Sequence, residues 1–244
     1  MRVIETAVCT LEPQLAAHAE AMFAVLSDPA IYEHENTPPA SVDALRERYG
    51  KLETRRSGDG RERWLNWVVR LPNGELTGYV QATVHADGRA AVAYEFASRY
   101  WGRGLARAAV EAMIGELVAY YGVRTLSAVL KRSNERSRRL LERLRFALAS
   151  PELHRQGSID ADELLMERDA PARRLEFDVF GKRILIERTP DGWRAFRPGS
   201  DGKRSALDIA IPDFVAEDEL LQYLDDLYHE LATPSNPCVR RVPG

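Results

Sequence analysis

One stretch of the sequence places glycines and arginines where a strand pattern gives way to a helix pattern. Residues 94–107 read Tyr-Glu-Phe-Ala-Ser-Arg-Tyr-Trp-Gly-Arg-Gly-Leu-Ala-Arg. A helix N-terminus carries unpaired N–H groups and the positive end of the helix dipole. Gly102 and Gly104 would let the backbone approach a ligand closely with positive φ. Because Arg99, Arg103 and Arg107 add positive charge, this pattern predicts a cradle for a pyrophosphate.

Other interpretations of this loop must be weighed against that prediction. A Walker loop needs Gly-Lys-Ser/Thr, which the stretch lacks. A Rossmann fingerprint needs a third glycine, and the sequence has Arg107 at that position. A plain glycine turn flanked by solvated arginines fits the loop as well as the cradle does when the loop is considered alone.

A second motif and the loop together carry a resemblance to a known family. Arg99-x-x-Gly102-x-Gly104-x-Ala106 resembles the acetyl-CoA pyrophosphate loop of the GNAT superfamily of N-acetyltransferases. Trp101-Gly102-Arg103-Gly104 is similar to the form in the branch that includes ribosomal-protein N-terminal acetyltransferases. Residues 134–146 resemble the family's Asn-x-x-Ser motif and the helix after it, with Arg145 where the family usually has glycine. The resemblance covers residues 1–168 and leaves a small C-terminal part unrecognised.

The resemblance implies a fold and a cosubstrate. The fold is GNAT-like, an α/β architecture with a mixed sheet and helices on both faces, which the order of expected elements also indicates. A V-shaped opening between strands at 90–96 and 125–130 would hold the pantetheine arm of acetyl-CoA. The cofactor-binding residues implied are Phe96, Ala97, Ser98, Arg99, Trp101, Gly102, Arg103, Gly104, Leu105, Ala106 and Asn134.

Glu95 is the first candidate for the base that the implied reaction needs. In that reaction an amine attacks the thioester directly, so the amine must lose a proton. A glutamate on a central strand is costly to bury unpaired, which means that it has either a partner or a function. An ordered water as the base, and an ion pair with a nearby arginine as the role of Glu95, stay open.

Ser137 is the candidate proton donor to the thiolate leaving group. GNAT enzymes often use a tyrosine of the last helix for this step, and Leu141 occupies that position here. Ser137 matches the serine that resembles a donor in the ribosomal-protein branch. The alternative is a hydroxyl that bonds to the backbone of its own helix.

Further polar residues have two possible roles each. Asn66 and Gln81 interrupt aromatic-rich strands and could orient the substrate or satisfy the backbone at a bulge. Residues 33–35, Glu-His-Glu, could attract a cationic amine or form a solvated loop. The basic residues between 131 and 145 could in part meet the 3′-phosphate of coenzyme A, and mostly indicate a solvated helix face.

Apolar spacing and turn residues predict the elements that position these side chains. We expect helices at residues 13–26, 41–52, 105–121 and 134–144. We expect strands at residues 2–11, 64–71, 78–85, 90–96, 125–130, 146–154 and 163–168. These elements form a predicted acetyltransferase domain over residues 1–169.

A Pro-containing linker at 169–174 separates this domain from a smaller β-β-β-α module at 173–244. We expect three strands between 175 and 197 with a Gly181-Lys182 turn, then a helix capped by Asp213. The inner face of that helix is expected to be Leu220, Leu224, Leu227 and Leu231, and residues 234–244 indicate a frayed tail. The module shows no catalytic constellation, and we expect it to dock on the first domain or to mediate a homodimer.

Composition narrows the class of protein. The 244 residues are 45% hydrophobic with a net charge of −3, which excludes a disordered chain and a general nucleic-acid binder. Two distant cysteines and five scattered histidines predict no disulfide framework and no metal. With no long apolar stretch and no signal-peptide pattern, we expect a cytoplasmic protein with no membrane partner.

The function predicted is transfer of an acetyl group from acetyl-CoA to a primary amine of a small molecule or a protein N-terminus. The alternative is a catalytically weak or inactive GNAT-fold CoA-binding protein that acts through its C-terminal module. Leu141 in place of the tyrosine donor favours the alternative, whereas the loop and Glu95 favour the enzyme.

Overall fold

The chain folds around two separate hydrophobic cores. The computed structural model describes residues 1–34, 36–157, 159–170, 174–189, 192–199, 204–212 and 214–242. The chain splits into two compact units, Met1–Ala170 and Pro171–Gly244, and each unit has its own cluster of buried side chains. Of the linker expected at 169–174, residues 171–173 lie outside the described part.

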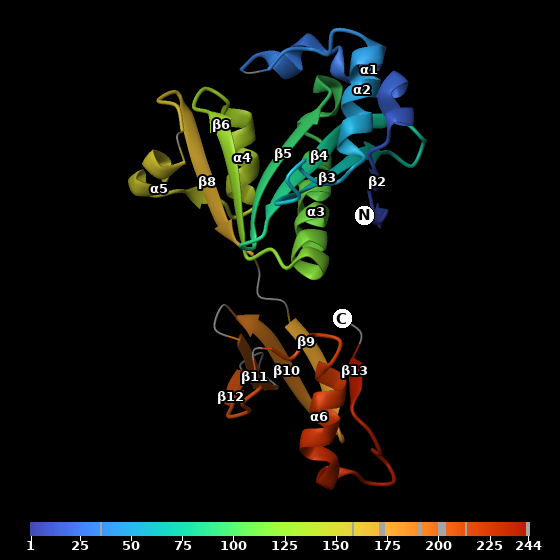
Figure 1. The fold of residues 1–244 in the computed structure, drawn as a ribbon, viewed down its shortest axis with the longest axis vertical. Helices are drawn as coiled ribbons and strands as arrows, with labels where there is room; N and C mark the ends of the chain where they lie inside the picture. Colours follow the sequence, from blue (N-terminus) through green and yellow to red (C-terminus); the bar gives the residue numbers. More distant parts are fainter. Residues whose placement is uncertain are drawn as a thin grey trace. The chain divides into compact units, whose positions relative to one another are not determined.

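A mixed sheet forms the frame of the Met1–Ala170 unit (Figure 1). In the described part of the chain its strand order is β1-β2-β3-β4-β5-β6-β8-β7, and only the β5–β6 pair is parallel. The strands are β1 (Ile4–Glu5), β2 (Thr10–Pro13), β3 (Glu62–Arg70), β4 (Leu76–His85), β5 (Arg89–Phe96), β6 (Thr125–Lys131), β7 (Ala147–Leu148) and β8 (Glu163–Asp169). The sheet confirms the fold class that the sequence predicted.

The sheet opens between its two parallel strands. Their pairing runs from Arg89↔Thr125 to Ala91↔Ser127, and the strands then separate toward their carboxyl ends (Figure 1). Beyond that point β5 stays paired with β4 up to Phe96, and β6 stays paired with β8. The sheet therefore has a first arm, β1 to β5, and a second arm, β6 to β8, with a V-shaped opening between them.

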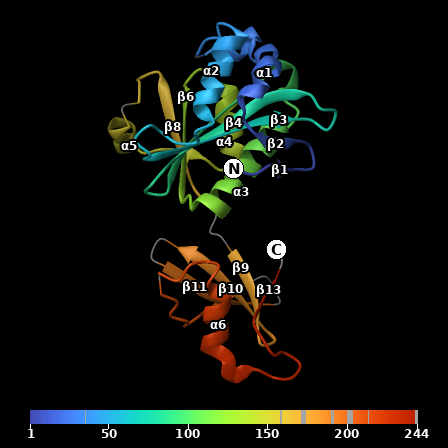
Figure 2. The ribbon, with the colours of Figure 1, turned by 45° about the vertical axis from the view of Figure 1, so that its right-hand side comes forward.

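Helices cover the sheet and flank the opening. The helices of this unit are α1 (Ala19–Leu26), α2 (Val42–Leu52), α3 (Leu105–Tyr121), α4 (Glu135–Arg143) and α5 (Pro151–Gln156). Both ribbon views show α1 and α2 side by side (Figure 1; Figure 2). The Ser41 hydroxyl accepts the Ala44 N–H at 3.1 Å, so serine caps α2 as expected. The helix expected at 105–121 matches α3.

The N-terminal elements differ from the prediction. The single strand expected at 2–11 is a hairpin, because the Thr6 N–H donates to the Cys9 carbonyl at 3.0 Å and turns the chain between β1 and β2. The helix expected from Pro13 begins only at Ala19. Pro13 instead ends β2 opposite Trp67, a strand terminus where its missing N–H breaks no ladder.

The strand expected at 146–154 is also mostly wrong. Only Ala147 and Leu148 pair with β8, and Pro151 then begins α5. The Ser150 hydroxyl caps this helix by accepting the Leu153 N–H at 3.3 Å. Serine followed by proline is a helix-start signal, and here it outweighs the apolar pattern.

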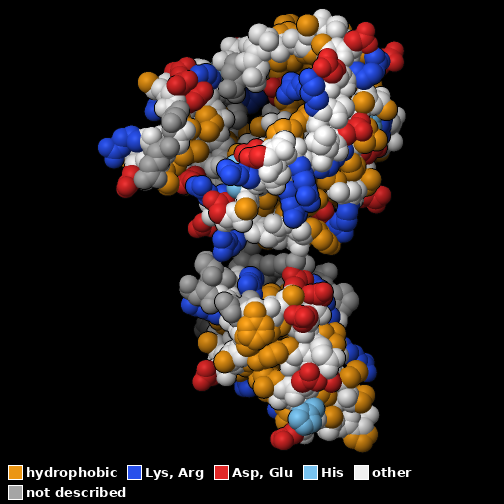
Figure 3. All heavy atoms as spheres, in the orientation of Figure 1, with side chains coloured by type: hydrophobic (Ala, Val, Ile, Leu, Met, Phe, Trp, Pro, Cys, Tyr) orange, Lys and Arg blue, Asp and Glu red, His pale blue; other side chains and the backbone are white. Residues whose placement is uncertain are grey.

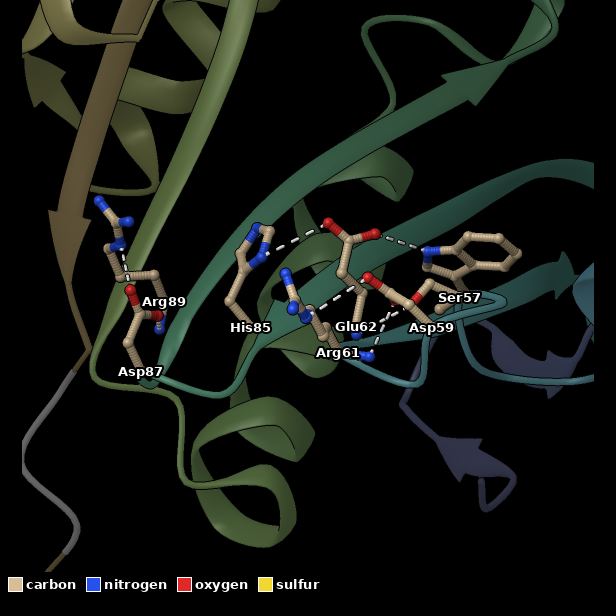
Figure 4. A network of polar contacts seen from close by, with 8 residues as sticks. Ser57, Asp59, Arg61, Glu62, His85, Asp87 and Arg89 are labelled. Carbon is tan, nitrogen blue, oxygen red and sulfur yellow. Dashed lines mark hydrogen bonds and ion pairs between the residues drawn. The ribbon is translucent and has the colours of Figure 1, made fainter.

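A polar network holds together the edge of the first arm where β3 and β5 begin (Figure 4). Glu62 accepts a hydrogen bond from the Trp64 indole N–H at 3.0 Å, and its other oxygen lies 3.6 Å from His85 Nδ1. Arg89 pairs with Asp87 at 2.9 Å in the turn between β4 and β5. These contacts tie neighbouring strands together and lie outside the cavity wall described below.

The C-terminal unit is an antiparallel sheet with one helix. In its described part the strand order is β12-β11-β10-β9-β13. The elements are β9 (Arg174–Val179), β10 (Lys182–Thr189), β11 (Gly192–Pro198), β12 (Arg204–Leu207), α6 (Leu220–Tyr228) and β13 (Arg240–Val242). Leu220 and Leu224 of α6 are buried in the same cluster as Phe177 and Ile186.

Three predictions for this unit are wrong. The tail expected to fray supplies β13, with Arg241 opposite Phe177, and β12 was not expected at all. The first turn has Phe180 and Gly181 at its centre, both with positive φ. Leu227, in the last turn of α6, is 48% exposed, and Leu231, beyond the end of α6 at Tyr228, is 39% exposed. The expected cap, Asp213, lies outside the described residues.

Candidate active site

The opening between the arms leads into a cavity of about 1110 Å³. A space-filling view shows a hollow between the arms of the Met1–Ala170 unit (Figure 3). Both arms, the α1–α2 region and α4 contribute to its wall. The predicted site residues in this wall are Glu95, Phe96, Trp101, Gly102, Gly104, Leu105, Ala106, Asn134 and Ser137. The structure does not place Ala97, Ser98, Arg99 and Arg103 in it.

The glycine loop is open toward the cavity. Gly102 has φ of +74° and Gly104 has φ of +78°, a conformation that favours glycine. No atom lies within 4 Å of the place where a Cβ on either glycine would be. The Ala108 N–H makes the bond to the Gly104 carbonyl at 3.1 Å, so the earlier amides of α3 remain available to a ligand. The loop has the space and the donors that a pyrophosphate needs.

Basic side chains surround this loop. The Arg136 guanidinium lies 3.5 Å from the centre of the Trp101 ring, and the Trp101 indole N–H donates to the Phe96 carbonyl at 2.8 Å. These two contacts fix the ring between α4 and the end of β5. Arg107, Arg139 and Arg143 also line the cavity, so cations from two helices face the place where phosphates would lie.

Residues 97–99 hold the end of β5 in place instead of lining the cavity. The Ala97 N–H donates to the Thr77 carbonyl at 3.0 Å, and the Ser98 N–H donates to Asp28 at 2.6 Å. Hydrogen bonding to Ser98 lowers the pKa of the Asp28 carboxyl below its ordinary value. Because both amides already have acceptors, a pantetheine chain would pair with other groups of this segment.

Glu95 lies on β5 directly opposite Tyr79 of β4. The Asn36 side-chain amide donates to its carboxylate at 3.3 Å. Burial raises the pKa of Tyr79 well above its ordinary value, and the negative charge of Glu95 raises it further. Burial also raises the pKa of Tyr32 to about 12, with Glu95 again adding to the shift. Glu95 therefore places a negative charge among tyrosine hydroxyls at the cavity wall.

Ser137 forms a hydrogen bond across the opening. Its Oγ lies 2.8 Å from the hydroxyl of Tyr94 on β5. Asn134 caps α4 by accepting the Ser137 N–H at 3.0 Å, which fixes the start of the helix. Burial raises the pKa of Tyr94 to about 12, while the bond to Ser137 opposes that shift. The sequence did not single out Tyr94, although it stands directly beside Glu95.

The segment between α1 and α2 bridges the two arms. His34 Nδ1 lies 3.0 Å from the Ser133 hydroxyl, which precedes α4 on the second arm. Asn36, which reaches Glu95 of the first arm, has φ of +67°. Positive φ at a residue other than glycine is uncommon and is found in functional loops. Glu35 of the predicted acidic cluster lies outside the described residues.

The structure adds three donors that sequence reasoning missed, Gln14, Arg48 and Tyr49, all in the cavity wall. Gln14 follows β2, whereas the other two are neighbours on α2. They lie far along the chain from the glycine loop, so no local pattern connects them with it. Of the polar residues considered, Gln81 also lines the cavity, and Asn66 is buried in β3 outside its wall.

The described residues contain neither a metal-binding cluster nor a membrane-spanning helix. Among them, no three His, Cys, Asp or Glu side chains gather in a way that could hold a metal ion. No helix in the described ranges is long and apolar enough to cross a membrane.

A mixed sheet split between two parallel strands, with a glycine loop beside the split, defines a class of acyltransferases. The family model described as the acetyltransferase (GNAT) domain matches residues 9–147, and the chain belongs to this family. A model described as a domain of unknown function (DUF7661) matches residues 174–243. Comparison with curated protein sequences gives no significant match.

Solved structures share the fold. Ribosomal-protein-S5-alanine acetyltransferase from Vibrio fischeri is 18% identical with a TM-score of 0.55, covering 70% of this chain and 97% of that one. RimL, a ribosomal L7/L12 alpha-N-protein acetyltransferase in complex with coenzyme A, is 14% identical with a TM-score of 0.58, covering 69% and 98%. The microcin C7 self-immunity acetyltransferase MccE, in complex with acetyl-CoA and AMP, is 13% identical with a TM-score of 0.56, covering 67% and 93%.

These matches confirm the resemblance that the two sequence motifs carried. The family and the fold indicate acyltransferase activity, and they do not favour the alternative of a CoA-binding protein without turnover. The acceptor is not given by any of the comparisons.

Proposed function

We propose that the Met1–Ala170 unit transfers an acetyl group from acetyl-CoA to a primary amine. The observation that carries this proposal is that one cavity joins the glycine loop, the opening between β5 and β6, and the Glu95 carboxylate. The complexes of two structural neighbours with coenzyme A and acetyl-CoA support the choice of cosubstrate.

The residues of this chain fit acetyl-CoA. The open amides from Gly102 to Ala106 would bind the pyrophosphate, and Arg107, Arg139 and Arg143 would neutralise phosphate charge. When bound, acetyl-CoA supplies the thioester that the amine attacks. The separated strands β5 and β6 leave backbone groups unpaired on their facing edges, where an extended arm can lie.

In the proposed reaction Glu95 removes a proton from the acceptor, and Ser137 supplies a proton to the leaving sulfur. Glu95 accepts a proton from the acceptor ammonium, because only the neutral amine has a lone pair for attack. Tyr94 Oη and Ser137 Oγ lie 2.8 Å apart, and either hydroxyl can donate. We assign the donor role to Tyr94, which would leave the Ser137 hydrogen free for the leaving sulfur. This pair takes the place of the tyrosine that the family often carries where Leu141 stands.

The test is a calorimetric titration of acetyl-CoA into the full chain. We expect micromolar binding, about −8 kcal/mol, for the wild type. In Gly104→Glu a side chain and a negative charge occupy the phosphate position, and binding is lost. Gly60→Glu is the matched control, since Gly60 also has positive φ, +72°, with nothing within 4 Å and lies outside the cavity. No binding to the wild type would contradict the proposal.

A further inference from the structure

The α2 side of the cavity carries a cation without an acidic partner. Arg48 lines the cavity, and no carboxylate of the described residues forms an ion pair with it. The other charged residues around it on α2 are paired, Arg46 with Asp43 and Lys51 with Glu47 at 2.8 Å. Arg48 is therefore available to an anionic group in the cavity.

Two buried polar residues line the same cavity as Arg48. Gln14 is 2% exposed and Tyr49 is 3% exposed, and both line the cavity. Within the described chain, Gln14 Nε2 and the Tyr49 hydroxyl have no hydrogen-bond partner. Buried polar groups are nearly always paired in folded proteins, because an unpaired donor loses its water without compensation. The wall of the cavity thus holds two buried polar groups whose hydrogen bonds the described chain does not supply.

The same cavity carries the negative charge of Glu95. Tyr32, Tyr49 and Tyr79 are each affected by both charges, since Glu95 raises their pKa values and Arg48 lowers them. The three phenol groups consequently lie close enough to both the Glu95 carboxylate and the Arg48 guanidinium to be affected by their charges. A site with both signs of charge matches a ligand with both signs of charge.

The space around these charges is apolar. The apolar residues that line the cavity in the α1–α2 region and on β5 are Leu26, Ile31, Leu45, Leu52, Val92 and Phe96. Such a lining favours a hydrocarbon side chain on the ligand and adds burial to the polar contacts.

We propose that the acceptor is a free amino acid with an apolar side chain, bound with its ammonium at Glu95 and its carboxylate at Arg48. This inference rests on the proposed acetyl transfer. A polyamine would bring a second cation to Arg48, and a protein N-terminus would offer a neutral carbonyl where the guanidinium calls for an anion. Two protons leave the ammonium nitrogen: one passes through Glu95 to solvent, and one balances the proton that the coenzyme A sulfur gains as the C–S bond breaks and the C–N bond forms.

The first experiment measures coenzyme A release from acetyl-CoA with matched amines. The panel contains leucine, leucinamide, isopentylamine and the tripeptide leucyl-glycyl-glycine, together with the corresponding phenylalanine series. We expect kcat/KM for the free amino acids to exceed that of every analogue by at least about tenfold, because the analogues bring no carboxylate to Arg48. Equal or faster turnover of the tripeptides or the simple amines would overturn the inference.

A second experiment tests the residue itself. Arg48→Gln is expected to raise KM for leucine at least about tenfold while leaving KM for leucinamide unchanged, since only the first acceptor carries an anion. Arg46→Gln is the matched control on the same helix and is expected to change neither value.

Calorimetric titration of leucine and phenylalanine into the protein with bound coenzyme A covers the case of slow turnover. Binding that Arg48→Gln abolishes supports the inference, and absence of amino-acid binding overturns it. Loss of this inference is distinct from loss of the proposed function, because acetyl-CoA binding and turnover of uncharged amines would preserve the latter. If acetyl-CoA itself does not bind, the proposed function fails.

Discussion

The two units of this chain differ in how they treat buried polar groups. In the C-terminal unit Glu187 is 5% exposed, and it accepts hydrogen bonds from Arg174 at 2.7 Å and from Arg204. In the Met1–Ala170 unit the donors of Gln14 and Tyr49 are buried at the cavity without partners in the described chain. The C-terminal unit pairs its buried carboxylate internally, whereas the first unit leaves these two buried groups of the cavity wall unpaired within the described chain.

The first unit also contains a buried carboxylate that is paired. Away from the cavity, Glu116 of α3 is buried and paired through both oxygens with Arg2, at 3.1 and 2.6 Å. Glu116 and Glu187, the buried carboxylates away from the cavity wall, are thus paired in both units. Gln14 Nε2 and the Tyr49 hydroxyl differ from these carboxylates because they have no partner in the described chain, which is also true of Arg55 Nη1 outside the cavity wall.

The largest expected effect comes from Glu95→Gln. Removing the base should lower kcat by about 100-fold or more, since general-base catalysis typically contributes at least that much. The amide keeps the size and hydrogen-bonding capacity of the side chain, so the free energy of unfolding should change by less than about 0.5 kcal/mol. Initial rates of coenzyme A release and a urea titration measure the two quantities. A fall in kcat of less than about threefold would assign the base to a water instead.

Glu187→Gln should lower stability without changing activity, the reverse of the result expected for Glu95→Gln. Losing the charge weakens two charge-assisted hydrogen bonds and should lower the local stability of the C-terminal sheet by about 1.5 kcal/mol. Acetyl transfer by the other unit should not change. Hydrogen exchange of the β9 and β10 amides, followed by mass spectrometry, measures the loss in place.

The control for that variant lies on the neighbouring strand. Glu176→Gln breaks the more exposed pair with Arg183, and a surface pair contributes at most about 1 kcal/mol. Equal effects of the two substitutions would show that burial does not set the difference between the units.

Local signals identified the elements that carry the cofactor loop. The helix at 105–121 was predictable because Gly104 and Gly122, both with positive φ, bound an apolar pattern of the correct period. The start of the helix expected at Pro13 was not, since the pairing of Pro13 with Trp67 joins positions far apart in sequence. Strand β13 was missed for the same reason, because only its pairing with β9 distinguishes it from a tail.

The residues of the candidate site also fall into two groups, those that a local sequence pattern predicts and those that depend on tertiary packing. The glycine loop, Glu95 and Ser137 could be named from motifs that are continuous in sequence. Arg48, Tyr49 and Gln14 could not, because their position in the cavity wall depends on how α2 and β2 pack against the sheet. The α2 side of the cavity is therefore the part that required the structure.

The smallest expected effect comes from the backbone at Arg145, a residue that belongs to none of the buried polar groups compared above. Arg145 has φ of +66° at the position after α4 where the family usually has glycine. The Phe146 N–H donates to the Leu141 carbonyl and the Arg145 N–H to the Glu142 carbonyl, both at 2.9 Å, so the helix ends in a Schellman motif despite the arginine. A side chain in this conformation costs about 1–2 kcal/mol.

Arg145→Gly should therefore stabilise the Met1–Ala170 unit. Part of the gain is lost, because glycine gives the unfolded chain more conformational freedom, so we expect a net increase of about 0.5 kcal/mol in the free energy of unfolding. Arg145→Ala is the control, since alanine removes the guanidinium and keeps the strained backbone. Urea titrations of the three proteins should place only the glycine variant above the wild type. Equal stabilisation by alanine would mean that the charge, and not the conformation, is what destabilises this turn.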